Sequence, residues 1–353
     1  MVYPRWMALD LLEIARRQLT LRTHRLHSLP VVVLMPHSRC NCRCVMCDIW
    51  KGNRDRQELG RDELTPHVEA FRRLRVRWVV LSGGEALMHS NLWALCELLA
   101  EIGVKITLLS TGLLLRRWAS EVVRWCDEVI VSLDGSREVH DAIRRIPRAF
   151  DQLADGVTAL RQVEPDYRVT ARCVLQRENY RDLPNIIRAG REIGLDSLSF
   201  LAADVSSEAF NRPDGWDGDR AGEVALSPEE ATDFARLLEQ VIAEHETDFT
   251  SGFVVESPEK LRRLAQYYLA LHGQGELPGA VCNAPWVSAV IEADGSVRPC
   301  FFHPAQGNLQ DRPLEQILNS AEAIDFRRQL DIERDPICRR CVCTLNLGPL
   351  ETF

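Results

Sequence analysis

The chain has 353 residues, of which 46% are hydrophobic and 27% charged, as expected for a globular enzyme with a sizeable core. A formal net charge of −8 and a sequence pI near 5.7 argue against nucleic acid as the main partner. No apolar stretch is long enough for a transmembrane helix, and the first residues lack the order of a secretory signal. The twelve cysteines therefore indicate metal binding or catalysis in a reducing cytoplasm rather than disulfides.

The amino-terminal segment predicts a helix over residues 4–27, in which apolar residues alternate with a basic face. We interpret it as an amphipathic packing helix, within residues 1–30, whose charged face lies in solvent. Contact with a membrane surface is the alternative, because basic amphipathic helices also bind there. That alternative leaves a lipid substrate open.

Short β-rich runs and segments with helical periodicity then alternate along the chain. The predicted strands are 31–35, 78–82, 105–110, 128–132, 168–175 and 197–201, and the predicted helices are 66–75, 90–102, 113–126, 149–163 and 181–193. This alternation predicts an α/β fold with a parallel sheet and outer helices. In barrels of this kind, the chemistry collects on loops that follow the carboxyl ends of the strands.

The second half of the chain begins with a polar, turn-rich stretch at 202–227, which we interpret as a lid-like loop. Helices are predicted over 228–245 and 257–272, and alternation around Asp294-Gly295 predicts a β-hairpin with a two-residue turn. We therefore predict three parts: an amino-terminal helix in 1–30, a strand–helix domain in 31–273 and a small cysteine-rich domain in 274–353.

A cluster of thiols follows the first predicted strand. Cys40, Cys44 and Cys47 have the spacing C-x3-C-x2-C, with Cys42 between them. Three thiolates on one short loop can hold three irons of a cubane cluster, which leaves the fourth iron free for a substrate or cofactor. A zinc knuckle is the alternative interpretation of these thiols.

This cysteine motif resembles that of the radical S-adenosylmethionine (radical SAM) family. The resemblance implies a partial (β/α)6 TIM-like barrel and a [4Fe–4S] cluster whose open iron binds SAM. In that family, one electron from the cluster cleaves SAM to a 5′-deoxyadenosyl radical, which abstracts a hydrogen atom from the substrate. The family spacing excludes Cys42 from the cluster, and Met46 stands where relatives place an aromatic residue against adenine.

The loop after the second predicted strand carries Gly83-Gly84-Glu85. Glycines there allow close approach of the backbone to a ligand, and a carboxylate beside them can bind a cationic amine. In the family, this element holds the amino group of SAM. The resemblance assigns Gly83, Gly84 and Glu85 to that role.

Further family positions follow later strands. The resemblance places Ser132 and Asp134, in Ser-Leu-Asp-Gly, near the ribose hydroxyls of SAM. Arg172 lies within a predicted strand, so it is expected inside the barrel with an anionic partner, a carboxylate of SAM or of the substrate. His140-Asp141 and Arg144 form a His-Asp-x-x-Arg pattern that also recurs in related chains, without a role assigned here.

A second set of thiols lies near the carboxyl end, with Cys282-x12-Gly-x4-Cys300 followed by Cys338-x2-Cys341 and Cys343. This pattern resembles the SPASM and twitch extensions of radical SAM enzymes, which bind auxiliary [4Fe–4S] clusters. The longer cysteine run of a full SPASM domain is absent, so one cluster of the twitch kind is expected. We assign Cys282, Cys300, Cys338 and Cys341 as its ligands, with Cys343 competing with Cys341, and zinc as the alternative metal.

A fully ligated auxiliary cluster is suited to electron transfer. The resemblance therefore implies a radical SAM oxidoreductase that passes an electron from a substrate radical to the auxiliary cluster, acting on a sugar, cyclitol or other small molecule. One alternative is a peptide maturase that forms cross-links. Another is a redox-neutral epimerase with Cys343 as hydrogen donor. A flavodoxin or ferredoxin is the expected electron donor, and Cys96, Cys126 and Cys173 are expected to be buried small hydrophobes.

Overall fold

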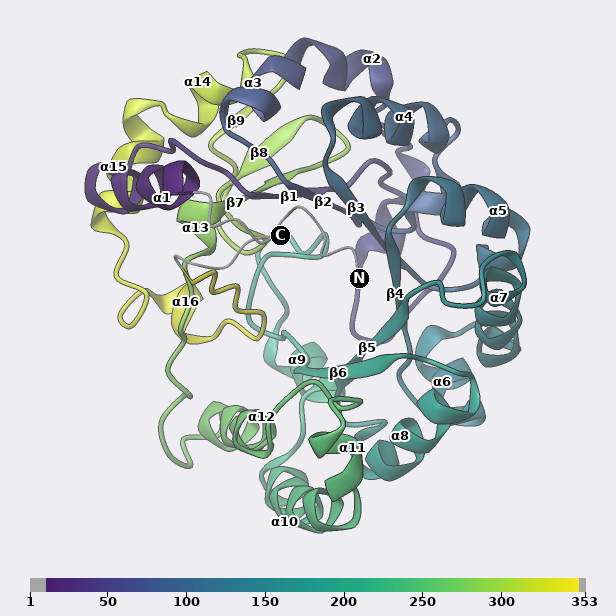
Figure 1. The fold of residues 1–353 in the computed structure, drawn as a ribbon. Coiled ribbons are helices and arrows are strands. Elements are labelled where there is room, and N and C mark those ends of the chain that lie inside the picture. Colours follow the sequence, from purple (N-terminus) through teal and green to yellow (C-terminus); the bar gives the residue numbers. More distant parts are fainter. Residues whose placement is uncertain (1–10, 349–353) are drawn as a thin grey trace.

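A curved sheet with helices on its outer face is the framework of the chain (Figure 1). The structure is a computed structural model that describes residues 11–348, so the predicted helical residues 4–10 lie outside the described part. Within that part, the strands form one nine-stranded sheet in the order β6-β5-β4-β3-β2-β1-β7-β8-β9. The first six pair in parallel, and the sheet is not closed into a barrel. The parallel sheet and partial barrel expected from the sequence are confirmed.

The strands agree closely with the predicted ranges. They are β1 Val31–Leu34, β2 Trp78–Leu81, β3 Lys105–Ser110, β4 Glu128–Ser132, β5 Val169–Leu175, β6 Ser197–Ala202, β7 Ser288–Ile291, β8 Ser296–Arg298 and β9 Gly307–Asn308. The first six strands consist mostly of β-branched and other apolar residues, and buried and half-buried positions alternate along most of them. One face of the sheet is therefore fully buried and the other only partly.

The helices follow the strands as the alternation predicts. The α-helices are α1 Leu11–Thr23, α2 Arg61–Leu64, α3 Val68–Arg73, α4 Leu92–Ile102, α5 Leu115–Trp125, α6 Arg137–Arg144, α7 Ala149–Val163, α8 Leu183–Glu192, α9 Gly218–Val224, α10 Pro228–Glu244, α11 Glu246–Thr250, α12 Pro258–Leu271, α13 Ala284–Val287, α14 Leu314–Leu318, α15 Ala321–Gln329 and α16 Pro336–Arg339, and the 3-10 helices are Ile49–Arg54, Thr65–His67, Ala86–Met88 and Tyr180–Asp182. None of the described helices is both long and apolar enough to span a bilayer.

Helix α1 is packed differently from the prediction. Glu13 and Arg17 are buried and form an ion pair of 3.2 Å, whereas Leu11, Leu12 and Leu19 are exposed. The carboxylate of Glu13 also accepts a hydrogen bond from the hydroxyl of Ser28, and it forms an ion pair of 3.2 Å with Arg75. The prediction that the charged face lies in solvent holds for Arg22 and Arg25, which are exposed, but is wrong for Arg17. Glu13 compensates the burial of that charge.

The carboxyl-terminal part continues the same sheet. Strand β7 pairs in parallel with β1, with Val31 opposite Ser288 and Leu34 opposite Ile291. The chain then turns back into β8, which pairs antiparallel with β7. The domain boundary near residue 273 stays a prediction, although the parts on either side of it share one sheet.

The hairpin loop between β7 and β8 is one residue longer than predicted. The N–H of Glu292 donates to the carbonyl of Ser296, and the N–H of Gly295 donates back to the carbonyl of Glu292, both at 2.9 Å. Ala293, Asp294 and Gly295 therefore form a three-residue loop. Gly295 takes a φ of 85°, the left-handed position that such loops require after a turn.

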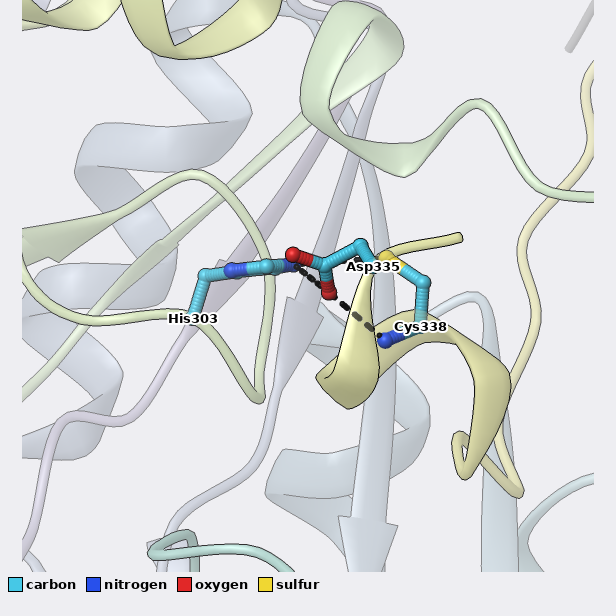
Figure 2. A group of neighbouring side chains, drawn as sticks. All are labelled: His303, Asp335 and Cys338. Carbon is cyan, nitrogen blue, oxygen red and sulfur yellow. Dashed lines mark hydrogen bonds and ion pairs between the residues drawn. The ribbon is translucent and has the colours of Figure 1, made fainter. Parts of the chain in front are cut away.

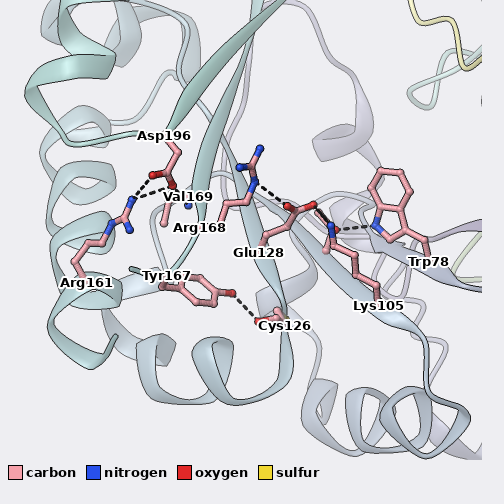
Figure 3. Close-up of polar contacts among 10 residues, drawn as sticks. Trp78, Lys105, Cys126, Glu128, Arg161, Tyr167, Arg168, Val169 and Asp196 are labelled. Atoms are coloured by element: carbon pink, nitrogen blue, oxygen red, sulfur yellow. Dashed lines mark hydrogen bonds and ion pairs between the residues drawn. The ribbon is translucent and has the colours of Figure 1, made fainter. Parts of the chain in front are cut away.

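A row of polar side chains lies at the amino-terminal ends of the parallel strands (Figure 3). Glu128 at the start of β4 accepts from Thr107 at 2.9 Å and pairs with Lys105 and Arg168, each at 3.1 Å. The indole of Trp78 donates to Thr107 at 2.7 Å, which extends the row to β2. These contacts fix the strand starts at the end of the sheet opposite the cysteine loop.

Candidate functional site

The Cys40–Cys47 loop leaves the carboxyl end of β1 and is anchored by its neighbours. The N–H groups of Arg43 and Val45 donate to the carbonyls of Arg144 and Ile143, at 3.2 and 3.0 Å. These carbonyls belong to the last turn of α6, where no partner within the helix is available. The cysteine loop is therefore held by the end of the helix that follows β4.

Arg144 links this loop to the sheet. Its Nη1 lies 3.4 Å from the sulfur of Cys44, and its Nη2 pairs with the fully buried carboxylate of Asp134. A hydrogen bond from Cys42 and the charge of Arg144 lower the pKa of Cys44 to about 6. Cys44 is thus prepared as a thiolate, the form that binds metals. Arg144 is the arginine of the His-Asp-x-x-Arg pattern, but the pattern in the sequence did not reveal its contacts with Cys44 and Asp134.

The three ligand candidates share one loop of eight residues. Burial, followed by the charges of Cys44 and Cys40, raises the pKa of Cys47 to about 12, because thiolates on such a short loop repel one another. Bound iron compensates such repulsion. The donor set therefore fits the iron cluster expected from the spacing. Cys42 is buried, and hydrogen bonds to Cys40 and Cys44 raise its pKa, in agreement with its exclusion from the ligands.

Gly83 and Gly84 are required by the close approach of the cysteine loop. A Cβ on Gly84 would lie 2.1 Å from the carbonyl oxygen of Arg39, directly before Cys40. A Cβ on Gly83 would lie 2.8 Å from the carbonyl oxygen of His37, and its φ of 115° excludes most side chains. Their contact with SAM stays a prediction, but the glycines already have a role in seating the loop.

Glu85 is completely buried, and both of its carboxylate oxygens have protein partners. The N–H and hydroxyl of Thr111 donate to Oε2 at 2.7 and 2.6 Å, and the hydroxyl of Ser110 lies 3.1 Å from both oxygens. Burial raises the pKa of Glu85. The carboxylate joins the ends of β2 and β3, and the hydroxyl of Thr111 also lies 3.1 Å from the side-chain amide of Asn41 in the cysteine loop.

The later candidates lie on β4 and β5. Ser132 and Arg172 are opposite each other in the register of these strands, and both are half-buried. The Nε of Arg172 lies 3.4 Å from the hydroxyl of Ser199 on β6. The carboxylate of Asp134 pairs with Arg144 and accepts a hydrogen bond from the N–H of Val174, the latter at 3.1 Å. Ribose contact by Ser132 or Asp134 and anion binding by Arg172 stay predictions.

The turn-rich stretch 202–227 is ordered against the cysteine loop. The indole of Trp216 donates to the buried carboxylate of Asp48 at 2.8 Å, and Arg220 donates to the carbonyl of Val45. Met46, in the same loop, is half-buried and packs against the hydrophobic core. The stretch therefore contacts the cysteine loop, while its role as a lid and adenine contact by Met46 stay predictions.

The second set of thiols comes from three segments. Burial, followed by the charges of Cys282 and Cys343, raises the pKa of Cys300. Burial, followed by the charge of Asp335, raises the pKa of Cys338, and burial, followed by the charge of Cys343, raises the pKa of Cys341. The sulfur of Cys341 lies 3.0 Å from the carbonyl oxygen of Cys343. The choice between these two as fourth ligand stays a prediction, as does hydrogen donation by the exposed Cys343.

A cavity of about 580 Å³ is lined by residues near the first cysteine loop and near Cys300 in the sequence, although no cysteine lies on its wall. Arg298 and Glu292 on its wall form an ion pair of 3.1 Å. Other wall residues are Ser38, two positions before Cys40, Gly84 after β2, residues 208–213 of the turn-rich stretch, and Phe301, which follows Cys300. Polar and charged groups thus line much of this cavity.

Two protein-family models match the chain, one over each set of thiols. Residues 34–189 match the radical SAM superfamily, and residues 282–342 match the SPASM iron–sulfur cluster-binding domain. The first match spans the loop with Cys40, Cys44 and Cys47, and the second contains Cys282, Cys300, Cys338 and Cys341.

Relatives of known name resemble most of the chain at low identity. The AdoMet-dependent heme synthase of Methanosarcina barkeri is 24% identical over 83% of this chain and 82% of its own length. The Fe-coproporphyrin III synthase of the same organism is 26% identical over 82% and 73%. The subtilosin biosynthesis protein AlbA of Bacillus subtilis is 23% identical over 80% and 58%.

Solved structures share the fold. The enzyme anSMEcpe with bound AdoMet superposes with a TM-score of 0.65 at 20% identity, covering 88% of this chain and 86% of that one. SuiB of Streptococcus suis bound to S-adenosylmethionine gives a TM-score of 0.64 at 12% identity, covering 93% and 75%.

Proposed function

Since the chain belongs to the radical SAM superfamily and carries an SPASM iron–sulfur cluster-binding domain, we propose that it is an oxidoreductase acting on a small molecule held between its two clusters. Its cofactors are S-adenosylmethionine, a SAM-binding [4Fe–4S] cluster and an auxiliary iron–sulfur cluster. The observation that carries the proposal is the cavity of about 580 Å³ whose wall includes Ser38, two positions before Cys40, and Phe301, directly after Cys300. That volume lies in the range typical of small-molecule sites.

The residues of the chain would divide the work by position. Cys40, Cys44 and Cys47 would hold the first cluster, and Cys282, Cys300, Cys338 and Cys341 the auxiliary cluster. When bound, the first cluster and SAM supply a 5′-deoxyadenosyl radical that abstracts hydrogen, and the auxiliary cluster supplies an acceptor for the electron that the substrate releases. The cavity wall would orient the substrate between them, and the segment 202–227 would exclude water.

The polar lining favours a hydroxyl- or amine-bearing substrate. Glu208 and Glu292 supply carboxylates, and Arg298 supplies a guanidinium next to Phe301. Such groups pair with hydroxyls and amines by hydrogen bonds that fix orientation. A sugar or cyclitol would offer groups of this kind, and a flavodoxin or ferredoxin would supply the reducing electron.

A peptide maturase is the second candidate. The similarity to AlbA, a bacteriocin biosynthesis protein, favours it. Two other relatives that cover most of the chain are named for heme and Fe-coproporphyrin III synthesis, which favours a small molecule. The carboxylates and aromatic rings of the cavity wall would also accept a peptide side chain.

The test is iron and sulfide content after anaerobic reconstitution, with reductive SAM cleavage assayed alongside. We expect about eight irons per chain, falling to about four in the Cys40→Ala, Cys44→Ala, Cys47→Ala variant, with 5′-deoxyadenosine formation abolished. The Cys96→Ala variant is the matched control, because that thiol is buried in the core and should leave the iron content unchanged.

Other outcomes would redirect the proposal. About four irons in the wild type and almost none in the triple variant would remove the auxiliary cluster, and with it the electron acceptor. A product whose mass is unchanged after reaction in H2O, but which takes up deuterium in D2O, would favour the epimerase, with Cys343 as the first residue to replace. Loss of two hydrogens from a peptide would favour the maturase.

A further inference from the structure

His303 contacts one of the auxiliary cysteines directly (Figure 2). Its Nε2 lies 3.3 Å from the sulfur of Cys338. The histidine follows β8, three residues after Cys300, whereas Cys338 lies in the short helix α16. The contact therefore joins two of the segments that converge on the proposed auxiliary cluster.

Both partners of this contact are held in place. The His303 side chain is 3% exposed, and its ring packs edge-on against Phe326 with centroids 5.0 Å apart. Asp335 accepts the N–H groups of Ile337 and Cys338, at 3.0 and 2.9 Å, which caps α16 and fixes the cysteine. The same carboxylate oxygen lies 3.7 Å from Nε2 of His303. The imidazole is therefore positioned by contacts on several sides.

The direction of the hydrogen bond follows from the chemistry of the cysteine. A cysteine that binds iron is a thiolate, which can accept a hydrogen bond but cannot donate one. The Nε2 of His303 must then be the donor. A hydrogen bond to a cluster sulfur withdraws electron density from the metal and stabilises the reduced, more negative state more than the oxidised state.

We propose that His303 is a positioning residue of the auxiliary cluster, whose Nε2–H donates a hydrogen bond to the sulfur of Cys338 and raises the reduction potential of that cluster. The inference rests on the proposed function, in which the auxiliary cluster accepts an electron from the substrate. A higher potential makes the cluster a better acceptor. His303 acts through Cys338 and needs no contact with the substrate.

The test uses variants that keep or remove the donor. His303→Leu fills the site without a donor, whereas the side-chain amide of His303→Gln provides an N–H near the position of Nε2. Phe326→Leu is the matched control, because it changes the packing of the ring and leaves the donor in place. All are made in the Cys40→Ala, Cys44→Ala, Cys47→Ala background, so that only the auxiliary cluster is observed.

The readouts are iron content and the midpoint potential of the auxiliary cluster, followed by electron paramagnetic resonance during an anaerobic redox titration. We expect about four irons in every variant. His303→Leu should shift the midpoint to more negative values by about tenfold in the equilibrium constant, or about 59 mV. His303→Gln should recover much of the shift, and Phe326→Leu should stay near the parent value.

Three results would overturn the inference. An unchanged midpoint in His303→Leu would show that the hydrogen bond does not tune the cluster, while the iron count would leave the proposed function standing. Loss of the cluster in both His303 variants would make His303 a ligand or a folding residue instead. His303, Asp335 and Cys338 have ligand atoms within 4.8 Å of one another, so they could also bind zinc. One zinc per chain in place of iron, lost in His303→Leu, would show that this site holds zinc, which would contradict both the inference and the proposed auxiliary cluster.

Discussion

The side chain of Arg144 contacts both a buried carboxylate and a candidate cluster ligand. It compensates the charge of Asp134, which is completely buried, and it lies against the sulfur of Cys44. A guanidinium suits this position because it presents several donors in a fixed plane and stays charged when buried. The same residue therefore supports the end of β4 and the thiolate form of a cluster ligand.

The first prediction concerns this pair. Arg144→Leu leaves the carboxylate of Asp134 buried without its cation, and we expect a loss of about 3 to 5 kcal/mol in the free energy of unfolding. Iron bound by the Cys40–Cys47 loop should fall as well. The measurements are urea denaturation of the apoprotein and iron content after reconstitution.

A double variant separates the two effects. Asp134→Asn with Arg144→Leu has no unpaired charge, so most of the stability should return while the iron content stays low. If iron binding recovered together with stability, the contact between Arg144 and Cys44 would have no role in holding the cluster.

His140 carries the second prediction, which is a dependence on pH. Its Nδ1 accepts the N–H of Asp134 at 3.1 Å, and burial, with the charge of Arg144, lowers its pKa to about 3. The unfolded chain takes up this proton near pH 6.5, whereas the folded chain does so only near pH 3. The folded state therefore loses about 1.4 kcal/mol for each pH unit as the pH falls through this window.

The test compares the wild type with His140→Asn. Asparagine keeps an oxygen that can accept the N–H of Asp134, but it does not titrate. We expect the wild-type apoprotein to lose stability between pH 6.5 and 4 more steeply than the variant, measured by urea denaturation at each pH. Parallel curves would mean that His140 is protonated in the folded state.

At the scale of elements, the loop after β2 is built around the loop after β1. Gly84 lies against the backbone of Arg39 and Cys40, and Glu85 fastens the same turn to Thr111 at the end of β3. The loops after β1, β2 and β3 thus form one packed unit. A substitution in the loop after β2 should therefore displace the cysteines in the loop after β1.

The third prediction follows from that packing. Gly84→Ala places a methyl group 2.1 Å from a backbone oxygen that no side-chain rotation can relieve. We expect a loss of about 1 to 3 kcal/mol in stability and a clear fall in iron bound by the first loop. Gly222→Ala in α9 is the control, because no atom lies within 4 Å of its Cβ, and it should stabilise the helix slightly. Normal iron content in Gly84→Ala would show that the loop can shift without losing the cluster.

The strands were predictable because their signal is local. Runs such as Val31–Leu34 and Val169–Leu175 are apolar and β-branched, and they are separated by segments with helical periodicity. The spacing of Cys40, Cys44 and Cys47 was equally local. The contacts of Arg144 with Cys44 and of His303 with Cys338 join residues 100 and 35 positions apart, so no spacing rule reveals them. The buried face of α1 was predicted wrongly for the same reason, since Glu13 owes its burial to partners outside its helix.

Across the whole molecule, the pairing of β7 with β1 matters most. The sequence predicted a separate cysteine-rich domain, and nothing local to Ser288–Ile291 indicates that this strand pairs with β1, more than 250 residues earlier. The result is a continuous sheet in which β1 leads to the first cysteine loop and β7 leads to the hairpin before Cys300. The sheet therefore links the first cysteine loop to the hairpin before Cys300, and the cavity wall includes Ser38 near the one and Glu292 and Arg298 of the other.

The last prediction tests this continuity by native-state hydrogen exchange on the full chain. Val31–Leu34 and Ser288–Ile291 are buried or nearly so and pair over their whole lengths. If they open as one cooperative unit, their slowest amides should have similar free energies of opening, close to that of global unfolding. Amides of helix α11, none of whose residues is buried, provide the fast-exchanging reference. Much faster exchange in β7 than in β1 would mean that the carboxyl-terminal part unfolds by itself, and the spacing between the two sets of thiols would then vary with that opening.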